Sequence, residues 1–227
     1  MVESKCPKQA GAAMSFDRLA PGYRAMEAVL AGGLLQRCRT AYLSEAGGRK
    51  RALLLGEGPG RFLVELLKVN PAIEVVCVEG SSRMILEAKR RLRRAGYNPD
   101  AVVFLHGDAL DWRAGGRSFD LIASHFFLDC FRPEELERLI PRVAEGAARD
   151  ARWLVADFCV PDAGWRRWRA KLIHAAMYAF FRRATGLSAT RLTPPDGFLE
   201  AVGFRLGQRS RFNLGLLQSD VWLKGPD

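Results

Sequence analysis

The feature that most constrains this chain is a glycine-rich turn that directly follows an apolar run. Three leucines at 53–55 lead into Gly56, Gly58 and Gly60, and a pattern typical of an amphipathic helix begins at Arg61. Such a turn brings a ligand against bare backbone, because glycine has no Cβ and the first N–H groups of a helix lack intrahelical partners. The sequence therefore predicts a strand–turn–helix unit with a ligand site at the carboxyl end of the strand.

Three further apolar segments also end on polar residues. In nucleotide-binding α/β sheets an acid at the tip of the second strand accepts hydrogen bonds from the ribose hydroxyls, and Glu79 lies about 20 residues beyond the glycine turn. Because the carboxyl ends of parallel strands meet at one edge of a sheet, we expect these tips to line one crevice. The segments and their polar ends are 75–78 with Glu79, 102–105 with Asp108, and 119–123 with Ser124 and His125.

The order of the predicted elements favours a doubly wound α/β fold. Strands alternating with helices predict a parallel sheet that is covered by helices on both faces. The expected strands are near 51–55, 74–78, 102–105, 119–124 and 153–158, and the expected helices are near 16–45, 61–69, 82–95 and from Pro133 onward.

These motifs resemble those of the class I S-adenosylmethionine-dependent methyltransferases. The glycine turn matches the first motif of that family as G-x-G-x-G, Glu79 its ribose-binding acid, and Asp108 with Ala109 its adenine-contacting pair. Residues 15–23 are similar to the N-terminal helix of the ubiquinone/menaquinone C-methyltransferase-like branch, in which an aromatic at the Tyr23 position lies over the cofactor.

The resemblance implies a Rossmann-like, mostly parallel seven-stranded sheet, which residues 203–206 and 216–223 close as an antiparallel hairpin. It also implies S-adenosyl-L-methionine as the cofactor and a small, hydrophobic acceptor molecule. The residues that it places at the cofactor are Tyr23, Gly56, Glu57, Gly58, Gly60, Glu79, Gly80, Ser81, Met84, Asp108, Ala109, Ser124 and His125.

The methionine end departs from the family pattern. Leu54 stands two residues before the first glycine, where the family usually has an acid, and Glu57 is the candidate to replace that contact with the methionine ammonium. A dinucleotide site would need G-x-G-x-x-G, and the residues after Gly60 are Arg61 and Phe62. A nicotinamide or flavin site is therefore disfavoured, and a purely structural turn stays open.

Acceptor chemistry points to the end of the 119–123 strand. In-line methyl transfer requires an aligned acceptor, a dry site and a group that removes the acceptor proton. His125 can be neutral at cell pH, and Asp129 would share a helical face with it and orient the imidazole. We predict both as catalytic residues. The alternatives are a histidine that only supports the pocket and an aspartate that starts a helix.

Residues 163–195 form a basic, aromatic segment that contains no Asp or Glu. Its composition predicts a helical insertion with three open interpretations: a lid over the acceptor, a peripheral contact with an anionic membrane, or a nucleic-acid face. The sequence 124–127, Ser-His-Phe-Phe, lacks the Asn/Asp-Pro-Pro-aromatic motif of base-amine methylation, so nucleic acid is disfavoured. The cations of the segment are Arg166, Arg167, Arg169, Lys171, Arg182, Arg183 and Arg191.

Length and composition predict a single methyltransferase domain over 15–227 after a flexible segment at 1–14. The N-terminal residues lack the apolar core of a signal peptide, and no run approaches the roughly 18 apolar residues that span a bilayer. Five scattered cysteines and three histidines without metal-type spacing predict reduced thiols and no metal site. We expect a cytoplasmic protein, with peripheral contact at a membrane left open. A non-catalytic cofactor-binding partner, which Leu54 favours, and an RNA methyltransferase are the alternative functions.

Overall fold

The computed structural model describes residues 33–185 and 192–225, with side chains described up to residue 179 in the helix that ends at 185. The predicted N-terminal segment at 1–14, the helix motif at 15–23 and Tyr23 lie outside the described residues.

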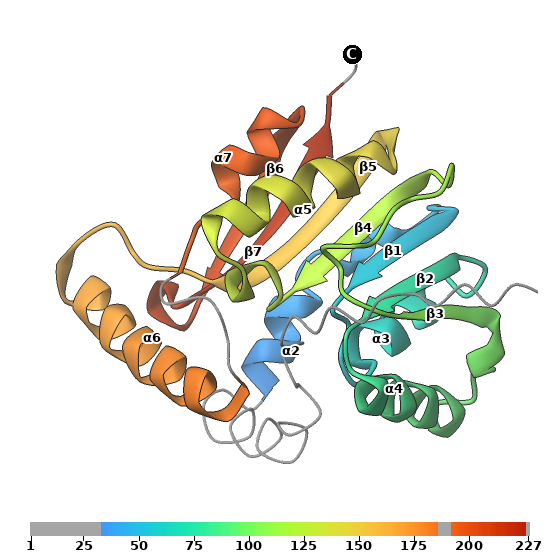
Figure 1. Cartoon of the computed structure of the whole chain (residues 1–227), viewed down its shortest axis with the longest axis horizontal. Coiled ribbons are helices and arrows are strands. Elements are labelled where there is room, and N and C mark those ends of the chain that lie inside the picture. The colour runs from blue at the N-terminus through green and yellow to red at the C-terminus, as the bar shows by residue number, and fades with distance from the viewer. Residues whose placement is uncertain (1–32, 186–191, 226–227) are drawn as a thin grey trace, which may run out of the picture.

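One seven-stranded sheet forms the centre of the molecule, in the order β3-β2-β1-β4-β5-β7-β6 (Figure 1). The first five strands along the chain pair in parallel, whereas β7 lies antiparallel to both β5 and β6. This confirms the predicted mostly parallel sheet with its antiparallel C-terminal hairpin. The strands are β1 Arg51–Leu55, β2 Glu74–Glu79, β3 Val102–His106, β4 Phe119–His125, β5 Ala147–Phe158, β6 Phe204–Phe212 and β7 Leu217–Lys224.

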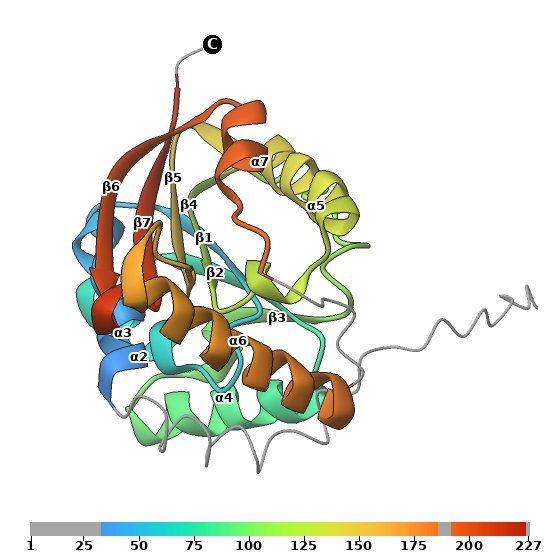
Figure 2. The same cartoon turned by 90° about the vertical axis from the view of Figure 1, so that its left-hand side faces the viewer.

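Helices cover both faces of the sheet and one of its edges (Figures 1 and 2). On one face lie α5 and α7, and on the other lie α2, α3 and α4. The long helix α6 stands beyond the carboxyl ends of the parallel strands. The helices are α2 Gly33–Arg39, α3 Arg61–Val69, α4 Ser82–Arg94, α5 Pro133–Glu145, α6 Gly164–Thr185 and α7 Asp196–Ala201, with short 3₁₀ turns η2 Leu43–Ala46, η3 Pro99–Ala101, η4 Leu128–Cys130 and η5 Asn213–Gly215. Within the described ranges, no helix has the length and apolar character needed to cross a membrane.

The apolar run of β1 is continuous because both of its faces are buried. Leu53 and Leu55 pack against the α5 side, while Leu54 packs against α3 on the other side. Side chains alternate between the two faces of a strand, so a strand in the middle of a parallel sheet needs apolar residues at every position. This two-sided burial makes the strand a firm base for the turn that follows it.

Two predicted boundaries were wrong. The helix expected through residue 45 ends at Arg39, where the Thr40 hydroxyl donates to the Gln36 carbonyl (2.9 Å) and a 3₁₀ turn follows after residue 42. Strand β5 begins at Ala147, six residues earlier than expected. The first part of β5 pairs irregularly with β4 and carries exposed, charged side chains, so its sequence does not resemble a buried strand.

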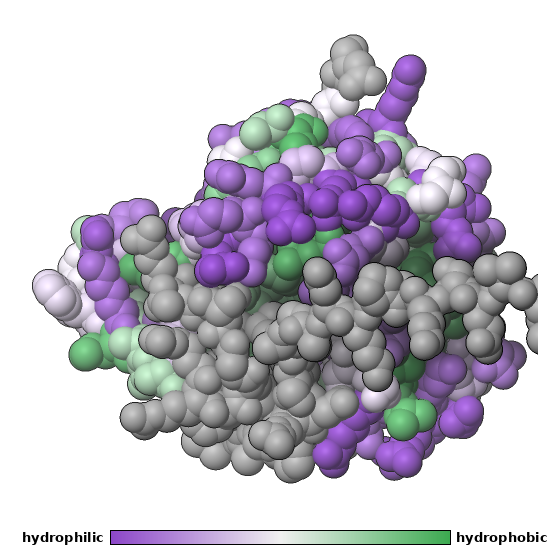
Figure 3. Space-filling model, in the orientation of Figure 1, coloured by the Kyte–Doolittle hydropathy of each residue, from purple (hydrophilic) through white to green (hydrophobic). Residues whose placement is uncertain are grey.

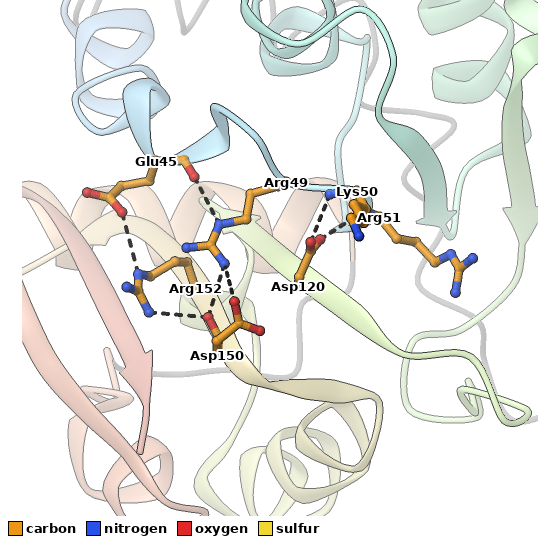
Figure 4. Close-up of polar contacts among 7 residues, drawn as sticks. All are labelled: Glu45, Arg49, Lys50, Arg51, Asp120, Asp150 and Arg152. Carbon is orange, nitrogen blue, oxygen red and sulfur yellow. Dashed lines mark hydrogen bonds and ion pairs between the residues drawn. The ribbon is translucent and has the colours of Figure 1, made fainter. Parts of the chain in front are cut away.

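The amino ends of the central strands are joined by polar contacts (Figure 4). The Asp120 carboxylate accepts the backbone N–H groups of Lys50 and Arg51, each at 2.8 Å. Arg49 donates to the Asp150 carboxylate at 3.0 Å. These contacts tie β1, β4 and β5 together at the edge opposite the predicted ligand site.

Candidate cofactor and acceptor site

The glycine turn between β1 and α3 requires all three of its glycines, for different reasons. Gly56, Gly58 and Gly60 have φ values of +61°, +66° and +77°, a region that other residues rarely adopt. A Cβ on Gly56 would overlap the Phe127 ring, and one on Gly60 would lie 3.0 Å from the backbone of Ala88 in α4. No described atom lies within 4 Å of a Cβ built on Gly58. The outer two glycines therefore permit close packing, and the middle one leaves open space at the turn.

Glu79 joins the tip of β2 to this turn. Its Oε2 accepts the N–H of Gly58 at 2.9 Å, and its Oε1 accepts the N–H of Ser81 at 3.0 Å. The side chain is buried, and this burial raises the pKa of its carboxyl group. The structure thus brings together the two residues on which the predicted cofactor site most depends.

The tip of β3 lies beside the tip of β2. The Gly107 N–H donates to the Glu79 carbonyl at 3.2 Å, and His106 Nε2 lies 3.1 Å from the Gly80 carbonyl. Asp108 is exposed, and its Oδ1 accepts the N–H of Leu110 at 2.9 Å. Its carboxylate is therefore accessible, next to the acid that is predicted to bind ribose.

Several predicted cofactor residues have structural contacts in addition. The Ser81 hydroxyl caps α4 by accepting the N–H of Met84 at 3.2 Å, and Ser124 Oγ accepts from the Trp153 indole at 2.9 Å. The Glu57 carboxylate accepts the N–H of Leu63 at 2.9 Å at the start of α3. Burial raises the pKa of Glu57 to about 7.

Leu54 is buried in the apolar cluster around α3, so no acid faces the turn from β1. The nearest acid in sequence, Glu57, has its carboxylate at the α3 N-terminus, where the helix dipole favours negative charge. Its predicted contact with a methionine ammonium remains a prediction.

At the tip of β4 the backbone takes an unusual conformation. Phe126 has a φ of +54°, which is costly for an aromatic residue and is typical of functional sites. The Arg39 guanidinium lies 4.9 Å from the centre of its ring, and the Phe158 ring lies 5.4 Å away. As a result, Phe126 faces α2 while Phe127 packs over Gly56.

His125 lies on the α3 side of the sheet, with its ring edge-to-face against Phe62 at 4.4 Å between centroids. Burial lowers its pKa to about 3, and the positive charge of Arg39 contributes in the same direction. The imidazole is therefore neutral at physiological pH and is a weak base. This environment favours the orienting role over the base role for His125.

Asp129 does not lie against His125 as predicted. Within the described residues its carboxylate contacts the Cys130 thiol at 3.6 Å, and its negative charge raises the pKa of Asp157 at the end of β5. The segment forms only the short turn η4, so the four-residue spacing does not put the two side chains on one helical face. Burial raises the pKa of Asp129 to about 6 and that of Asp157 well above its usual value.

Three residues near this site were missed by the sequence reasoning. Asp157 Oδ1 accepts the Phe127 N–H at 3.1 Å, and its buried Oδ2 makes no hydrogen bond within the described parts of the chain. Tyr178 of α6 donates to the Asp129 carbonyl at 3.0 Å, and Arg39 is buried beside Phe126. A carboxylate at the end of a strand was the available signal for Asp157. Arg39 and Tyr178 carried none, because only the fold brings α2 and α6 to the strand tips.

These residues fit the cofactor that the motifs imply. A carboxylate at the β2 tip suits a ribose diol, and an accessible carboxylate at the β3 tip suits an exocyclic amine. The open turn at Gly58, on the other side of the β2 tip, leaves room for the rest of the cofactor. By contrast, no group of three or more His, Cys, Asp or Glu in the described ranges is arranged to hold a metal ion.

Comparison with known proteins assigns the family. The chain is 33% identical over 186 residues to a demethylmenaquinone methyltransferase from Roseiflexus sp. (strain RS-1), an alignment that covers 78% of this chain and 69% of the relative. The chain belongs to the class I S-adenosylmethionine-dependent methyltransferases. In agreement, residues 52–149 of this methyltransferase match a family described as a methyltransferase domain. These residues include the glycine turn, Glu79 and the β4 tip.

Other relatives are longer than this methyltransferase. It is 27% identical over 108 residues to a carboxy-S-adenosyl-L-methionine synthase from Nautilia profundicola, and the alignment covers 48% of this chain and 44% of that protein. An O-methyltransferase family protein from Burkholderia thailandensis shares the fold, with a TM-score of 0.67 and 18% identity over 94% of this chain and 64% of that one. Mitomycin 7-O-methyltransferase has a TM-score of 0.64 and 18% identity, over 94% of this chain and 62% of its own. The chain thus spans less than two thirds of each of these three proteins.

Proposed function

We propose that this methyltransferase transfers a methyl group from S-adenosylmethionine to a small, hydrophobic acceptor. The observation that carries the proposal is the buried Glu79 carboxylate, which links the β2 tip to the Gly58 amide. A carboxylate in that place accepts hydrogen bonds from ribose hydroxyls, and the turn beside it has space for the rest of the cofactor. S-adenosylmethionine supplies an activated methyl group when bound.

Glu79 and Asp108 would hold the nucleoside, with Gly80, Ala109 and Met84 around them. The turn at 56–60 would hold the amino-acid end. The protein's task is then to align the acceptor and exclude water, since in-line displacement depends mainly on geometry.

The β4 and β5 tips are the proposed acceptor side. Neutral His125 can accept a hydrogen bond and orient a protic acceptor, and the buried Oδ2 of Asp157 can receive a proton or hydrogen bond from one. Asp129, whose charge raises the pKa of Asp157, would act through Asp157. Phe127 supplies apolar surface beside the glycine turn, and Phe126 supplies apolar surface on the α2 side of the β4 tip.

The relatives support a hydrophobic acceptor. The relative from Roseiflexus sp. is named for demethylmenaquinone, and one solved structure is named for a mitomycin 7-O-methyltransferase. By this analogy the acceptor would be an aromatic, quinone-like or lipid-soluble compound. We propose a cytoplasmic protein that meets such an acceptor at the membrane surface.

Calorimetric titration with S-adenosylmethionine and S-adenosylhomocysteine tests the cofactor site. We expect binding to both, and we expect Glu79→Ala to weaken it by at least about tenfold, which corresponds to about 1.4 kcal/mol. The matched control is Glu74→Ala, because Glu74 lies exposed at the other end of the same strand, paired with Arg51. This control should bind as the wild type does.

Two results would contradict the proposal. If folded wild-type protein binds neither compound, the chain has the methyltransferase fold but no working cofactor site. Leu54, which replaces the usual acid, would then be the first residue to examine. If Glu79→Ala and Glu74→Ala bind equally well, the β2 tip is not the nucleoside site.

A further inference from the structure

Helix α6 carries apolar side chains on two opposite faces. Its inner face is buried and is formed by Ala170, His174, Met177 and Tyr178. Its outer face carries large apolar side chains that remain exposed, although the helix is held firmly on the fold. The inner face is buried against the rest of the fold, whereas no described part of the chain buries the outer face.

The outer face is defined by Trp165, Trp168 and Leu172, which are 62%, 70% and 71% exposed. Their i, i+3, i+7 spacing places them on one stripe of the helix, and the exposed residues Ala176 and Ala179 continue it. Single exposed apolar residues are ordinary, but two tryptophans and a leucine in a row indicate an interaction site.

Positive charge flanks this stripe. Arg166 and Lys171 are exposed on either side of it, and Lys171 Nζ lies 5.6 Å from the centre of the Trp168 ring. No acidic residue occurs between Asp162 and Asp196, so the cations of the outer face have no acidic partner on α6 itself. Apolar side chains between cations match the interface of an anionic bilayer, where Trp lies at the headgroup level and Arg and Lys contact the phosphates.

The helix also lies in the right place. Tyr178 donates to the Asp129 carbonyl, and Arg169 donates to the Asn213 carbonyl at 3.2 Å and to its side-chain oxygen at 2.9 Å. These contacts hold α6 across the carboxyl ends of the strands, beside the proposed acceptor side (Figure 2). In Figure 3, hydrophilic residues cover α5, whereas apolar residues emerge at the left-hand edge, where Figure 1 places α6.

We propose that the outer face of α6 binds the surface of a bilayer that contains anionic phospholipids. The role of this contact, which is to bring the site to an acceptor dissolved in the membrane, rests on the proposed function. A symmetric contact between two copies of this face would bring like charges together, and an RNA would meet apolar side chains at the centre of the stripe. Both occupants fit less well than lipid.

Co-sedimentation with lipid vesicles tests the surface directly. The wild type should bind vesicles of phosphatidylcholine mixed with phosphatidylglycerol, and should bind pure phosphatidylcholine at least about tenfold more weakly. The double variant Trp165→Ser/Trp168→Ser should lose binding to the mixed vesicles by at least about tenfold. The variant Arg166→Gln/Lys171→Gln should bind both kinds of vesicle almost equally. The matched control is Leu86→Ser, since Leu86 is 56% exposed on α4, away from this face. It should bind as the wild type does.

Equal wild-type binding to both vesicle types, or full binding by the double tryptophan variant, would overturn the proposal. So would a wild-type dimer that the tryptophan variant dissociates, or an RNA complex that the same substitutions abolish. Calorimetry with S-adenosylhomocysteine on the same samples separates the two proposals. A variant that no longer binds vesicles but still binds S-adenosylhomocysteine is altered in the α6 surface alone. If the wild type itself does not bind S-adenosylhomocysteine, the proposed function fails, whatever the vesicle result.

Discussion

At the scale of single residues, the strained backbone of the proposed site lies at the tip of β4. Phe126 holds a left-handed backbone conformation, and its ring is fixed between Arg39 and Phe158. Such a conformation persists only where neighbouring contacts enforce it. Phe126 packs on the α2 side of the sheet, and the Phe127 ring lies against the glycine turn.

His125 should stay neutral throughout the physiological pH range. Burial and the nearby Arg39 charge lower its pKa to about 3, so protonation is disfavoured in the folded protein. We expect the NMR signals of its ring to keep neutral-form shifts between about pH 5 and 8. The packing-conserving variant His125→Phe assigns them. A titration midpoint above pH 5 would contradict this environment.

The sequence was sufficient to locate the residues that bring backbone motifs together, such as Glu79 and Gly58. They follow a fixed spacing along the chain, and the structure shows them in contact. The Asp129–His125 pairing was not found, because it assumed a helix where the chain makes a single 3₁₀ turn. Arg39 and Tyr178 escaped notice because their proximity to the site depends on tertiary packing alone, whereas Asp157 carried the signal of a carboxylate at a strand end that was not used.

At the scale of elements, the junction of η4, β5 and α6 contains a pair of buried acids. Asp129 and Asp157 are both buried, and their mutual repulsion raises the pKa of Asp157 further. A carboxyl whose pKa is raised by folding binds its proton more tightly in the folded state. Its protonated form therefore favours folding, and this contribution is lost as pH rises through the folded-state pKa.

Asp157→Asn should increase the free energy of unfolding at pH 8, by about 1–3 kcal/mol. The amide oxygen can still accept the Phe127 N–H, while the repulsion with Asp129 is removed. The gain should shrink as pH falls below about 6, where Asp129 takes up a proton. Urea denaturation at pH 5 and pH 8 measures both quantities.

The control for this experiment is Asp111→Asn, the same chemical change at an exposed position. It should leave the free energy of unfolding nearly unchanged at both pH values. A loss of stability in Asp157→Asn that is the same at pH 5 and pH 8 would show that the charge of Asp157 is well compensated.

The strand β1, which is buried on both faces, and the amphipathic helix α3 were predicted almost to the residue. Continuous apolar runs and the helix period identify such elements without knowledge of their neighbours. The start of β5 was missed because its first residues are held by an irregular pairing with β4 and carry charged side chains. The end of α2 was missed because the sequence has neither glycine nor proline there.

At the scale of the whole molecule, the sheet has two edges with different tasks. The carboxyl edge bears the glycine turn, the acidic strand tips and α6. The amino edge bears the polar contacts of Figure 4, in which Asp120 accepts two backbone N–H groups and Arg152 pairs with Glu45 at 3.5 Å. The core separates these two edges.

Asp120→Ala should therefore lower stability without changing cofactor affinity. Removing two hydrogen bonds to a charged acceptor should cost about 1–3 kcal/mol of unfolding free energy. Asp120→Asn retains one acceptor oxygen and should lose less. Urea denaturation and calorimetry with S-adenosylhomocysteine measure the two effects, and a parallel fall in affinity would contradict the separation.

The contacts of Asp120 have a consequence for how this protein can change. Under the proposed function, acceptor preference would be set by the strand tips and α6, where substitutions commonly carry a cost in folding. Because the opposite edge anchors three strands through backbone groups, tightening that edge would offset such costs without touching the chemistry. Substitutions that change the acceptor at the carboxyl edge can thus be combined with stabilising substitutions at the amino edge, in evolution or by design.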